Sequence, residues 1–138
     1  MTQDPLVLKP IGWVESPLRS REEAPLQGDE GAPDAAVVFE PAVQEALDGL
    51  QVDADVLLIT WLDRADRNVL VVHPRDDPAR PATGVFNTRS SDRPNPLGLH
   101  RVTVLAVDGL RVQVRNLEAL DGTPVVDVKP VLDPGVER

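Results

Sequence analysis

The chain has 138 residues and a formal net charge of −9 at pH 7, with 41% hydrophobic and 27% charged residues, which fits one globular domain with a buried core. The absence of cysteine excludes disulfides, thiol catalysis and thiolate metal sites, and the presence of only two histidines argues against a histidine-rich metal site. The acidic charge argues against non-specific binding of nucleic acid, because such binding depends on neutralising phosphates.

The N-terminal third of the chain predicts two strands and one helix. Residues 10–14 (PIGWV) and 35–39 (AAVVF) have the apolar character of strands, and a polar loop joins them. Residues 40–50 (EPAVQEALDGL) predict a short helix, because Pro41 suits a first helical turn and Gly49 lies near the C-terminal end. Four apolar residues of this segment fall on one helical face: Val43, Ala46, Leu47 and Leu50.

The middle of the chain predicts two further strands. Residues 56–61 (VLLITW) are nearly all apolar, as in a strand that is buried on both faces. Residues 69–72 (VLVV) are the candidate partner of that strand. The following segment contains three prolines, which stiffen a loop that leads to Gly84.

The clearest local signal is a hairpin, VTVLAV-DG-LRVQV. Asp108-Gly109 favours a two-residue type I′ turn, because both central positions of that turn need a positive φ. The second run alternates apolar and polar residues, which predicts one buried face formed by Leu110, Val112 and Val114. The whole pattern predicts a mainly β domain, closed or sandwich-like, with one short helix.

Several familiar signatures are missing from the sequence. There is no GxGxxG after a strand, no GxxxxGK[ST] phosphate loop and no GxSxG nucleophile elbow. No apolar run approaches about eighteen residues, so no membrane span is predicted, and the first ten residues lack a secretory signal. A cytoplasmic protein without a metal site is the simplest interpretation, and His73 is interpreted as a strand-end histidine near the surface.

Residues 86–101 (FNTRSSDRPNPLGLHR) form a stiff basic segment within this acidic chain. Two prolines disfavour a helix here and restrict the residues before them to extended conformations. Arg89 and Arg93 offer planar donor groups for a carboxylate or a phosphate, and Asn95 offers a donor and an acceptor. The segment is therefore either a pre-ordered anion-binding loop or a turn whose arginines pair with the protein's own carboxylates.

Residues 117–130 (LEALDGTPVVDVKP) form a second candidate segment. Asp121-Gly122 predicts a turn, and VVDVKP predicts a short strand that ends on Lys129. Asp127 lies two residues before this lysine, so both side chains share one face of the strand. On spacing alone, the pair is either functional or a surface ion pair that contributes little to stability.

Together these segments resemble a known family. GVFNTRSSDRPNPLGLHRVTVL resembles GVFATRSPxRPNPIGLSxVxLL, the signature of the TsaA-like domain of the tRNA methyltransferase O family, and LEALDGTPVVDVKP is similar to that family's LDxLDGTPVLDIKPY block. IGWVESPL resembles the family's opening IGxIxSPF, and the segment from ALDGL to LLITWLDRAD is similar to its central part. The resemblance covers residues 10 to about 132.

The resemblance implies one TsaA-like domain over residues 1–138, without the C-terminal extension of longer members. It implies a mainly β fold, a single-sheet antiparallel β-barrel with one or two short helices. It also implies S-adenosylmethionine as the cofactor, bound near the subunit interface of a homodimer. The characterised activity of the family is methylation of N6 of threonylcarbamoyladenosine 37 in a threonine tRNA.

The resemblance also implies roles for individual residues. Arg89 is expected to meet the methionine carboxylate of the cofactor, and Leu99 is expected to line the pocket. Glu118 replaces the family's aspartate and keeps a carboxylate for the ribose or the sulfonium region. The complete set of expected cofactor-binding residues is Gln27, Gly28, Asp63, Arg89, Leu99, Leu117 and Glu118.

Three positions depart from the family's pattern. Leu26 replaces the arginine of the PRQ loop, Asp63 stands at a usual histidine, and Val131 replaces the KPY tyrosine. Methyl transfer depends mainly on positioning, and a base or a cation near the acidified N–H of the acceptor would assist it. The residues expected near the acceptor are Asp127 and Lys129 as catalytic groups, with Arg93 and Asn95 as substrate contacts.

Three functions remain open at this point. The chain is a tRNA adenosine N6-methyltransferase, a methyltransferase that acts on another small molecule or RNA, or a non-catalytic module that binds S-adenosylmethionine. The departures from the pattern and the acidic charge leave cofactor binding better supported than the tRNA substrate.

Overall fold

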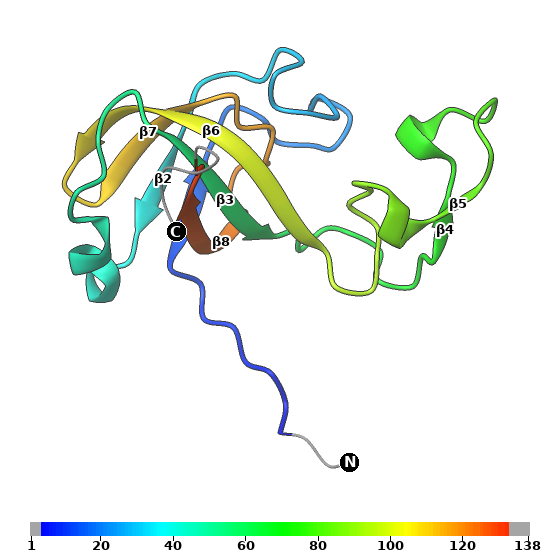
Figure 1. The fold of residues 1–138 in the computed structure, drawn as a ribbon, viewed down its shortest axis with the longest axis horizontal. Helices are drawn as coiled ribbons and strands as arrows, with labels where there is room; N and C mark the ends of the chain where they lie inside the picture. Colours follow the sequence, from blue (N-terminus) through cyan, green and yellow to red (C-terminus); the bar gives the residue numbers. More distant parts are fainter. Residues whose placement is uncertain (1–3, 133–138) are drawn as a thin grey trace.

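The computed structural model describes residues 4–132, and six strands form its main sheet (Figure 1). The sheet is antiparallel, with the order β1-β2-β7-β6-β3-β8, and β8 pairs back with β1, so that the strands close into a barrel. The prediction of a mainly β fold built on one antiparallel sheet is therefore confirmed. The strands are β1 (Gly12–Glu15), β2 (Ala35–Phe39), β3 (Asp55–Trp61), β6 (Leu97–Asp108), β7 (Arg111–Arg115) and β8 (Pro124–Pro130).

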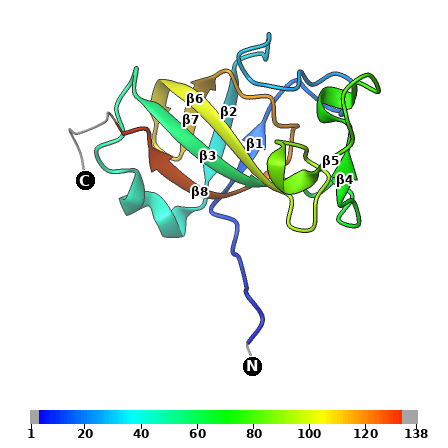
Figure 2. The same cartoon turned by 45° about the vertical axis from the view of Figure 1, so that its right-hand side comes forward.

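A small lobe lies beside the barrel. It contains β4 (Val71–Val72) and β5 (Thr83–Gly84), which pair only as a two-stranded sheet, and Figures 1 and 2 both show this hairpin at the right-hand side of the molecule. The expectation that residues 69–72 pair with residues 56–61 is therefore wrong. Both edges of β3 are already occupied, because β6 and β8 flank it in the barrel.

The helical segments are short and of the 3₁₀ type: η1 (Pro41–Leu47), η2 (Pro74–Asp76) and η3 (Val85–Asn87). The predicted helix corresponds to η1, with Pro41 in its first turn and a positive φ of 86° at Gly49 just beyond its end. Ala46 is exposed rather than packed, because the 3.6-residue period assumed for that face does not apply to a 3₁₀ helix. No helix within residues 4–132 is long and apolar enough to cross a membrane.

The hydrophobic core fills the inside of the barrel. In β3, buried Val56, Leu58 and Thr60 alternate with half-buried residues, so the expectation that this strand is buried on both faces is wrong. One face of a barrel strand points outward, and here that face is only partly covered. In β7, Val112 and Val114 are buried as predicted, and Val43, Leu47 and Leu50 pack against the core from outside.

The β6–β7 hairpin has its turn one residue later than expected. Asp108 pairs with Arg111, so the two central residues are Gly109 and Leu110, and of these only Gly109 has a positive φ. This is the pattern of a type II′ turn, in which glycine takes the first central position. The predicted type I′ turn with Asp108 at its centre is therefore wrong, although the hairpin itself forms.

The long strand β6 has two halves with different neighbours. Leu97–Thr103 pairs with β3, whereas β7 pairs with β6 only from Thr103 to Asp108. Residues 97–102 of β6 have no partner in β7. The edge of this N-terminal half that faces away from β3 therefore lies beside loops instead of a strand. The candidate site lies along this half.

Candidate functional site

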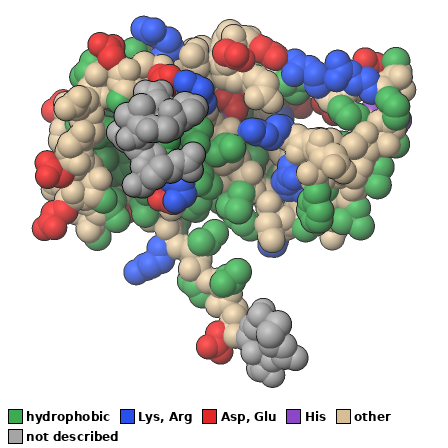
Figure 3. All heavy atoms as spheres, in the orientation of Figure 1, with side chains coloured by type: hydrophobic (Ala, Val, Ile, Leu, Met, Phe, Trp, Pro, Cys, Tyr) green, Lys and Arg blue, Asp and Glu red, His purple; other side chains and the backbone are tan. Residues whose placement is uncertain are grey.

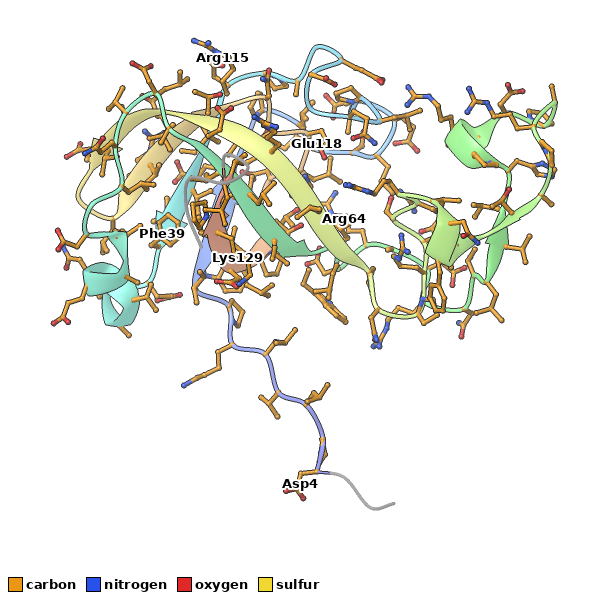
Figure 4. All side chains as sticks on the ribbon, viewed as in Figure 1. Asp4, Phe39, Arg64, Arg115, Glu118 and Lys129 are labelled. Atoms are coloured by element: carbon orange, nitrogen blue, oxygen red, sulfur yellow. The ribbon has the colours of Figure 1, made fainter. Side chains whose placement is uncertain are left out.

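A cavity of about 400 Å³ lies along the N-terminal half of β6. Four chain segments that are far apart in the sequence form its wall: the β1–β2 loop, the start of β3, β6 itself and the segment after β7. Figure 4 shows Glu118 of the last segment among the loops beside β6. The lining residues are Gln27, Gly28, Asp29, Asp55, Leu99, His100, Arg101, Thr103, Asn116 and Glu118.

The inner wall of the cavity contains a hydrogen-bonded chain of three side chains. Glu118 Oε1 lies 2.6 Å from His100 Nδ1, and His100 Nε2 lies 2.7 Å from Thr60 Oγ1. Thr60 is fully buried and His100 is 5% exposed, so neither is free to turn to solvent. Because a carboxylate oxygen can only accept here, the hydrogen-bond pattern assigns a proton to Nδ1.

Two glycines make the close approaches at this wall possible. A β-carbon at Gly98 would collide with Thr60 Oγ1 and lie 2.6 Å from His100 Nε2. A β-carbon at Gly28 would collide with the carbonyl oxygen of Asn116 and lie 2.8 Å from Glu118 Oε2. The β1–β2 loop therefore packs its backbone directly on the segment that carries Glu118.

An acidic and a basic residue pair at the other end of the cavity. Asp55 accepts hydrogen bonds from Thr103 Oγ1 at 2.6 Å and from Arg101 Nη2 at 3.1 Å. The Thr103 hydrogen bond and then the Arg101 hydrogen bond lower the pKa of Asp55 below its usual value, against a smaller opposing effect of burial. The cavity thus has the Glu118 carboxylate at one end and a guanidinium at the other.

The structure brings four of the predicted cofactor-binding residues together, namely Gln27, Gly28, Leu99 and Glu118. Leu117 is next to Glu118, but its side chain is fully buried in the core, so only its backbone is available to a ligand. Asp63 is exposed in the turn after β3, and Arg89 is exposed in the loop before β6. Within residues 4–132, neither of these last two lines the cavity.

Arg93 holds the loop that carries Arg89. Its guanidinium donates to the carbonyl oxygens of Val85, Thr88 and Ser90 at distances of 2.9–3.0 Å. The arginine thus pairs with backbone carbonyls, and within residues 4–132 it forms no ion pair with a carboxylate of the protein. Its expected contact with substrate stays a prediction.

Asn95 belongs to a contact between two loops. Its Oδ1 accepts a hydrogen bond from Arg67, and Arg67 also donates to the carbonyl oxygen of Pro94 at 2.7 Å. The same guanidinium lies 5.1 Å from the centre of the Trp61 ring, within the range of a cation–π contact. Among residues 4–132 the amide NH₂ group of Asn95 has no hydrogen-bond acceptor, so it can serve as the donor for the predicted substrate contact.

Asp127 and Lys129 form an ion pair of 3.5 Å on β8, with half or more of each side chain exposed. They share the outer face of the sheet with cavity-lining residues of β6, and β3 lies between. Neighbouring strands are about 4.8 Å apart, so the pair lies about 10 Å from the β6 side chains, and Figure 4 shows Lys129 on this part of the sheet. The strand pairings form two rows across the sheet: Leu99–Ile59–Asp127 and Arg101–Leu57–Lys129.

Charge is unevenly distributed on the face drawn in Figure 3. Acidic side chains gather at the barrel end, and several basic side chains lie toward the lobe. The basic region is therefore on the side that carries the lobe.

Sequence reasoning missed six of the ten residues that line the cavity. His100 and Arg101 end the distinctive 86–101 segment, but nothing in their spacing places them at a ligand site. Asp55 and Thr103 meet only because β3 pairs with β6. Strand register was the missing information.

The family model for the tRNA-methyltransferase O N-terminal domain matches residues 13–134 of the chain. A protein from Methanothermobacter thermautotrophicus, named as a probable S-adenosyl-L-methionine-binding protein, is 42% identical, and the match covers 89% of this chain and 88% of that protein. The S-adenosyl-L-methionine-binding protein of Archaeoglobus fulgidus is 41% identical, with coverages of 90% and 88%.

A solved structure is similar over the whole chain. The crystal structure of TrmO from Pseudomonas aeruginosa matches with a TM-score of 0.73 and 28% identity, and the match covers 100% of this chain and 61% of that one. The chain therefore spans about three fifths of the length of that TrmO, but most of the length of the two archaeal relatives.

Proposed function

Because the chain belongs to the family of tRNA-methyltransferase O N-terminal domains, we propose that it is a methyltransferase that binds S-adenosylmethionine in the cavity along β6. One observation carries this proposal. Gln27, Gly28, Leu99 and Glu118 are four of the seven residues for which the family resemblance predicts cofactor binding, and they come from three distant segments to one cavity.

The cavity suits this cofactor in size and in chemistry. Its volume of about 400 Å³ lies within the range of ligand pockets. Glu118 offers an acceptor for hydroxyl or ammonium groups, and Arg101 offers a cationic donor for a carboxylate. The apolar Leu99 side chain adds a surface on which a base can pack.

S-adenosylmethionine supplies an electrophilic methyl group when it is bound. The chain's own residues have to orient the cofactor and hold the acceptor in line with the methyl group, because positioning provides much of the acceleration. Asp127 and Lys129 lie about 10 Å from the cavity wall, on the outer face where an acceptor would approach. The Asp127 carboxylate can take the proton of an acceptor N–H, and the Lys129 ammonium can stabilise the resulting negative charge.

As the methyl acceptor we propose N6 of threonylcarbamoyladenosine 37 in tRNA. The match to the family model and the similarity to TrmO along the whole chain support this choice. A tRNA substrate would also place the protein in the cytoplasm.

The test is transfer of a labelled methyl group from S-adenosylmethionine to purified tRNA. Two tRNAs of the same sequence are compared, one with threonylcarbamoyladenosine at position 37 and one with plain adenosine. We expect label only in the modified nucleoside of the first tRNA. Label in neither tRNA would contradict the proposed acceptor.

A second function is favoured by the names of the archaeal relatives. Both match over nearly their full length and are named only for binding S-adenosylmethionine. In addition, the Asp127–Lys129 pair has the exposure of an ordinary surface ion pair. A binding module would bind the cofactor without producing S-adenosylhomocysteine, whereas a methyltransferase with a different acceptor would produce it once that acceptor is supplied.

We also propose that the protein is a homodimer. The lobe exposes Leu70, Val71 and Phe86 at 64%, 60% and 80%, and such apolar patches mark interaction surfaces. Arg89, which is expected to meet the cofactor, does not line the described cavity of its own chain. A second copy with its lobe over this cavity would bury the patch and bring Arg89 to the cofactor.

A further inference from the structure

The hydrogen-bonded chain from Thr60 through His100 to Glu118 links the barrel interior to the cavity. The exposed fractions rise along it, from fully buried Thr60 to 4% for the His100 side chain and 16% for the Glu118 side chain. We propose that His100 is a positioning residue: held by Thr60, it fixes the Glu118 carboxylate for ligand binding. This inference rests on the proposed function, because the ligand concerned is S-adenosylmethionine.

The two oxygens of the Glu118 carboxylate have different surroundings. Oε1 accepts the hydrogen bond from His100 Nδ1. Oε2 lies on the side of the β1–β2 loop, since it is the oxygen that a β-carbon at Gly28 would approach to 2.8 Å. Gln27, Gly28 and Asp29 of that loop line the cavity together with Glu118, so one oxygen is anchored by His100 and the other faces the loop side of the cavity.

The anchor matters because a glutamate side chain has three rotatable bonds. Without a partner the carboxylate would sample many positions, and a ligand would have to bear the entropy cost of fixing it. A hydrogen bond from a buried ring makes that ordering part of the folded state. Donor groups of the ligand, either hydroxyl or ammonium, then meet an acceptor that is already in place.

The anchor itself is rigid. His100 is on β6 and Thr60 is on β3, and the ladder between these strands pairs Thr60 with Gly98 and Leu58 with His100. The ring and the hydroxyl meet in the space that Gly98 leaves, because a β-carbon at residue 98 would collide with the hydroxyl. The position of His100 Nδ1 is therefore set by the barrel and not by a loop.

The alternative is that the three side chains only satisfy one another's buried polar groups. Two substitutions of His100 separate these roles, because each keeps a different one of the two hydrogen bonds that the ring makes. In His100→Asn, the amide nitrogen takes the place of Nδ1 and still donates to Glu118. In His100→Gln, the amide reaches the place of Nε2 and contacts Thr60, while Glu118 loses its donor.

The experiment is calorimetric titration of the full chain and both variants with S-adenosylmethionine, with thermal unfolding of each protein measured in parallel. For positioning, we expect His100→Asn to stay within about threefold of the wild-type affinity and His100→Gln to bind about tenfold more weakly, the effect of one hydrogen bond to a charged group. Equal losses of affinity in both variants, or losses that follow the unfolding temperature, would overturn the inference.

The same samples distinguish failure of this inference from failure of the proposed function. If the wild type does not bind S-adenosylmethionine, the proposed function fails, and the ligand part of the inference fails with it. Nitrogen NMR of the ligand-free protein tests the hydrogen-bonded chain of side chains separately, because it reports which ring nitrogen of a histidine carries the proton. His73 is the only other histidine and is exposed, so the His100 signals can be told apart. We expect the proton of His100 on Nδ1; a ring with its only proton on Nε2 would overturn the inference whether or not the cofactor binds.

Discussion

Arg93 donates a hydrogen bond of 2.9 Å to the carbonyl oxygen of Val85, eight residues earlier in the chain. With its bonds to Thr88 and Ser90, this contact folds the loop around one guanidinium. The loop that presents Arg89 is therefore ordered before any ligand arrives.

Replacing Arg93 by alanine should loosen this loop. The loss of hydrogen bonds from a charged donor should lower the free energy of unfolding by about 1–3 kcal/mol. Hydrogen exchange should show faster exchange of the Ser90 region, and chemical denaturation gives the free energy. Arg115→Ala, at an exposed position on β7, is the matched control, and equal behaviour of the two variants would contradict the role of Arg93.

Replacing Arg89 by alanine should leave the fold intact and weaken cofactor binding. The side chain is exposed, so its removal creates no cavity, while the expected contact with a carboxylate is lost. Calorimetry with S-adenosylmethionine should show a loss of about tenfold or more. An unchanged affinity would remove Arg89 from the site.

Gly98→Ala should destabilise the barrel, because its β-carbon would collide with Thr60 in a fully buried position. We expect a cost of about 1–3 kcal/mol, as for other overpacked cores. Gly84→Ala is the control, because a β-carbon there meets nothing closer than 3.7 Å. Thermal unfolding measures both variants, and similar midpoints would show that the β3–β6 contact adapts.

Lowering the pH should show how much the ionised Asp55 carboxylate contributes to the stability of the fold. Its pKa is lowered in the folded state, first by Thr103 and then by Arg101, so the stabilisation is fully present above the unfolded value near 3.8. It is lost as the pH falls through the lower folded pKa. Thr103→Val removes the largest cause, so the stability gap between wild type and variant should narrow below about pH 4. Chemical denaturation at several pH values measures the difference in the free energy of unfolding between the two proteins. A difference that does not change with pH would contradict this account.

Polar substitution of Phe86 should weaken the proposed dimer. Phe86 is 80% exposed on the lobe, and Phe86→Ser removes apolar surface without opening the core. Light scattering should show a dimer for the wild type and a shift toward monomer for the variant. Val52→Ser changes an exposed apolar residue elsewhere and should have no effect. A monomeric wild type would exclude the dimer.

Local pattern predicted the strands with clear alternation and the turn at Gly122, whose φ is 82°. It also predicted the register of side chains in β7. It failed where distant segments decide the outcome. Residues 69–72 were expected to pair with residues 56–61, yet Val71 and Val72 pair with β5 in the lobe, because β3 already has two partners in the barrel.

The cavity shows the same division. Gln27, Gly28, Leu99 and Glu118 were predicted because family motifs place them in the cofactor site, and they do meet. The contact between His100 and Thr60 joins residues forty positions apart and depends on the register of β3 against β6. No spacing along the chain contains that information. The position of the hairpin turn was also undetermined, because glycine can take either central position.

The two halves of β6 have different structural roles. Its C-terminal half forms a ladder with β7, and Thr103 is the one residue of β6 that pairs with both β3 and β7. Its N-terminal half has a ladder on one side and loops on the other, and those loops contribute Gln27 and Glu118. Related chains can therefore exchange loop residues and alter which ligand they hold, while the barrel pairing keeps its register. Among such related chains, ligand specificity can then change faster than the strand pairing that maintains the fold.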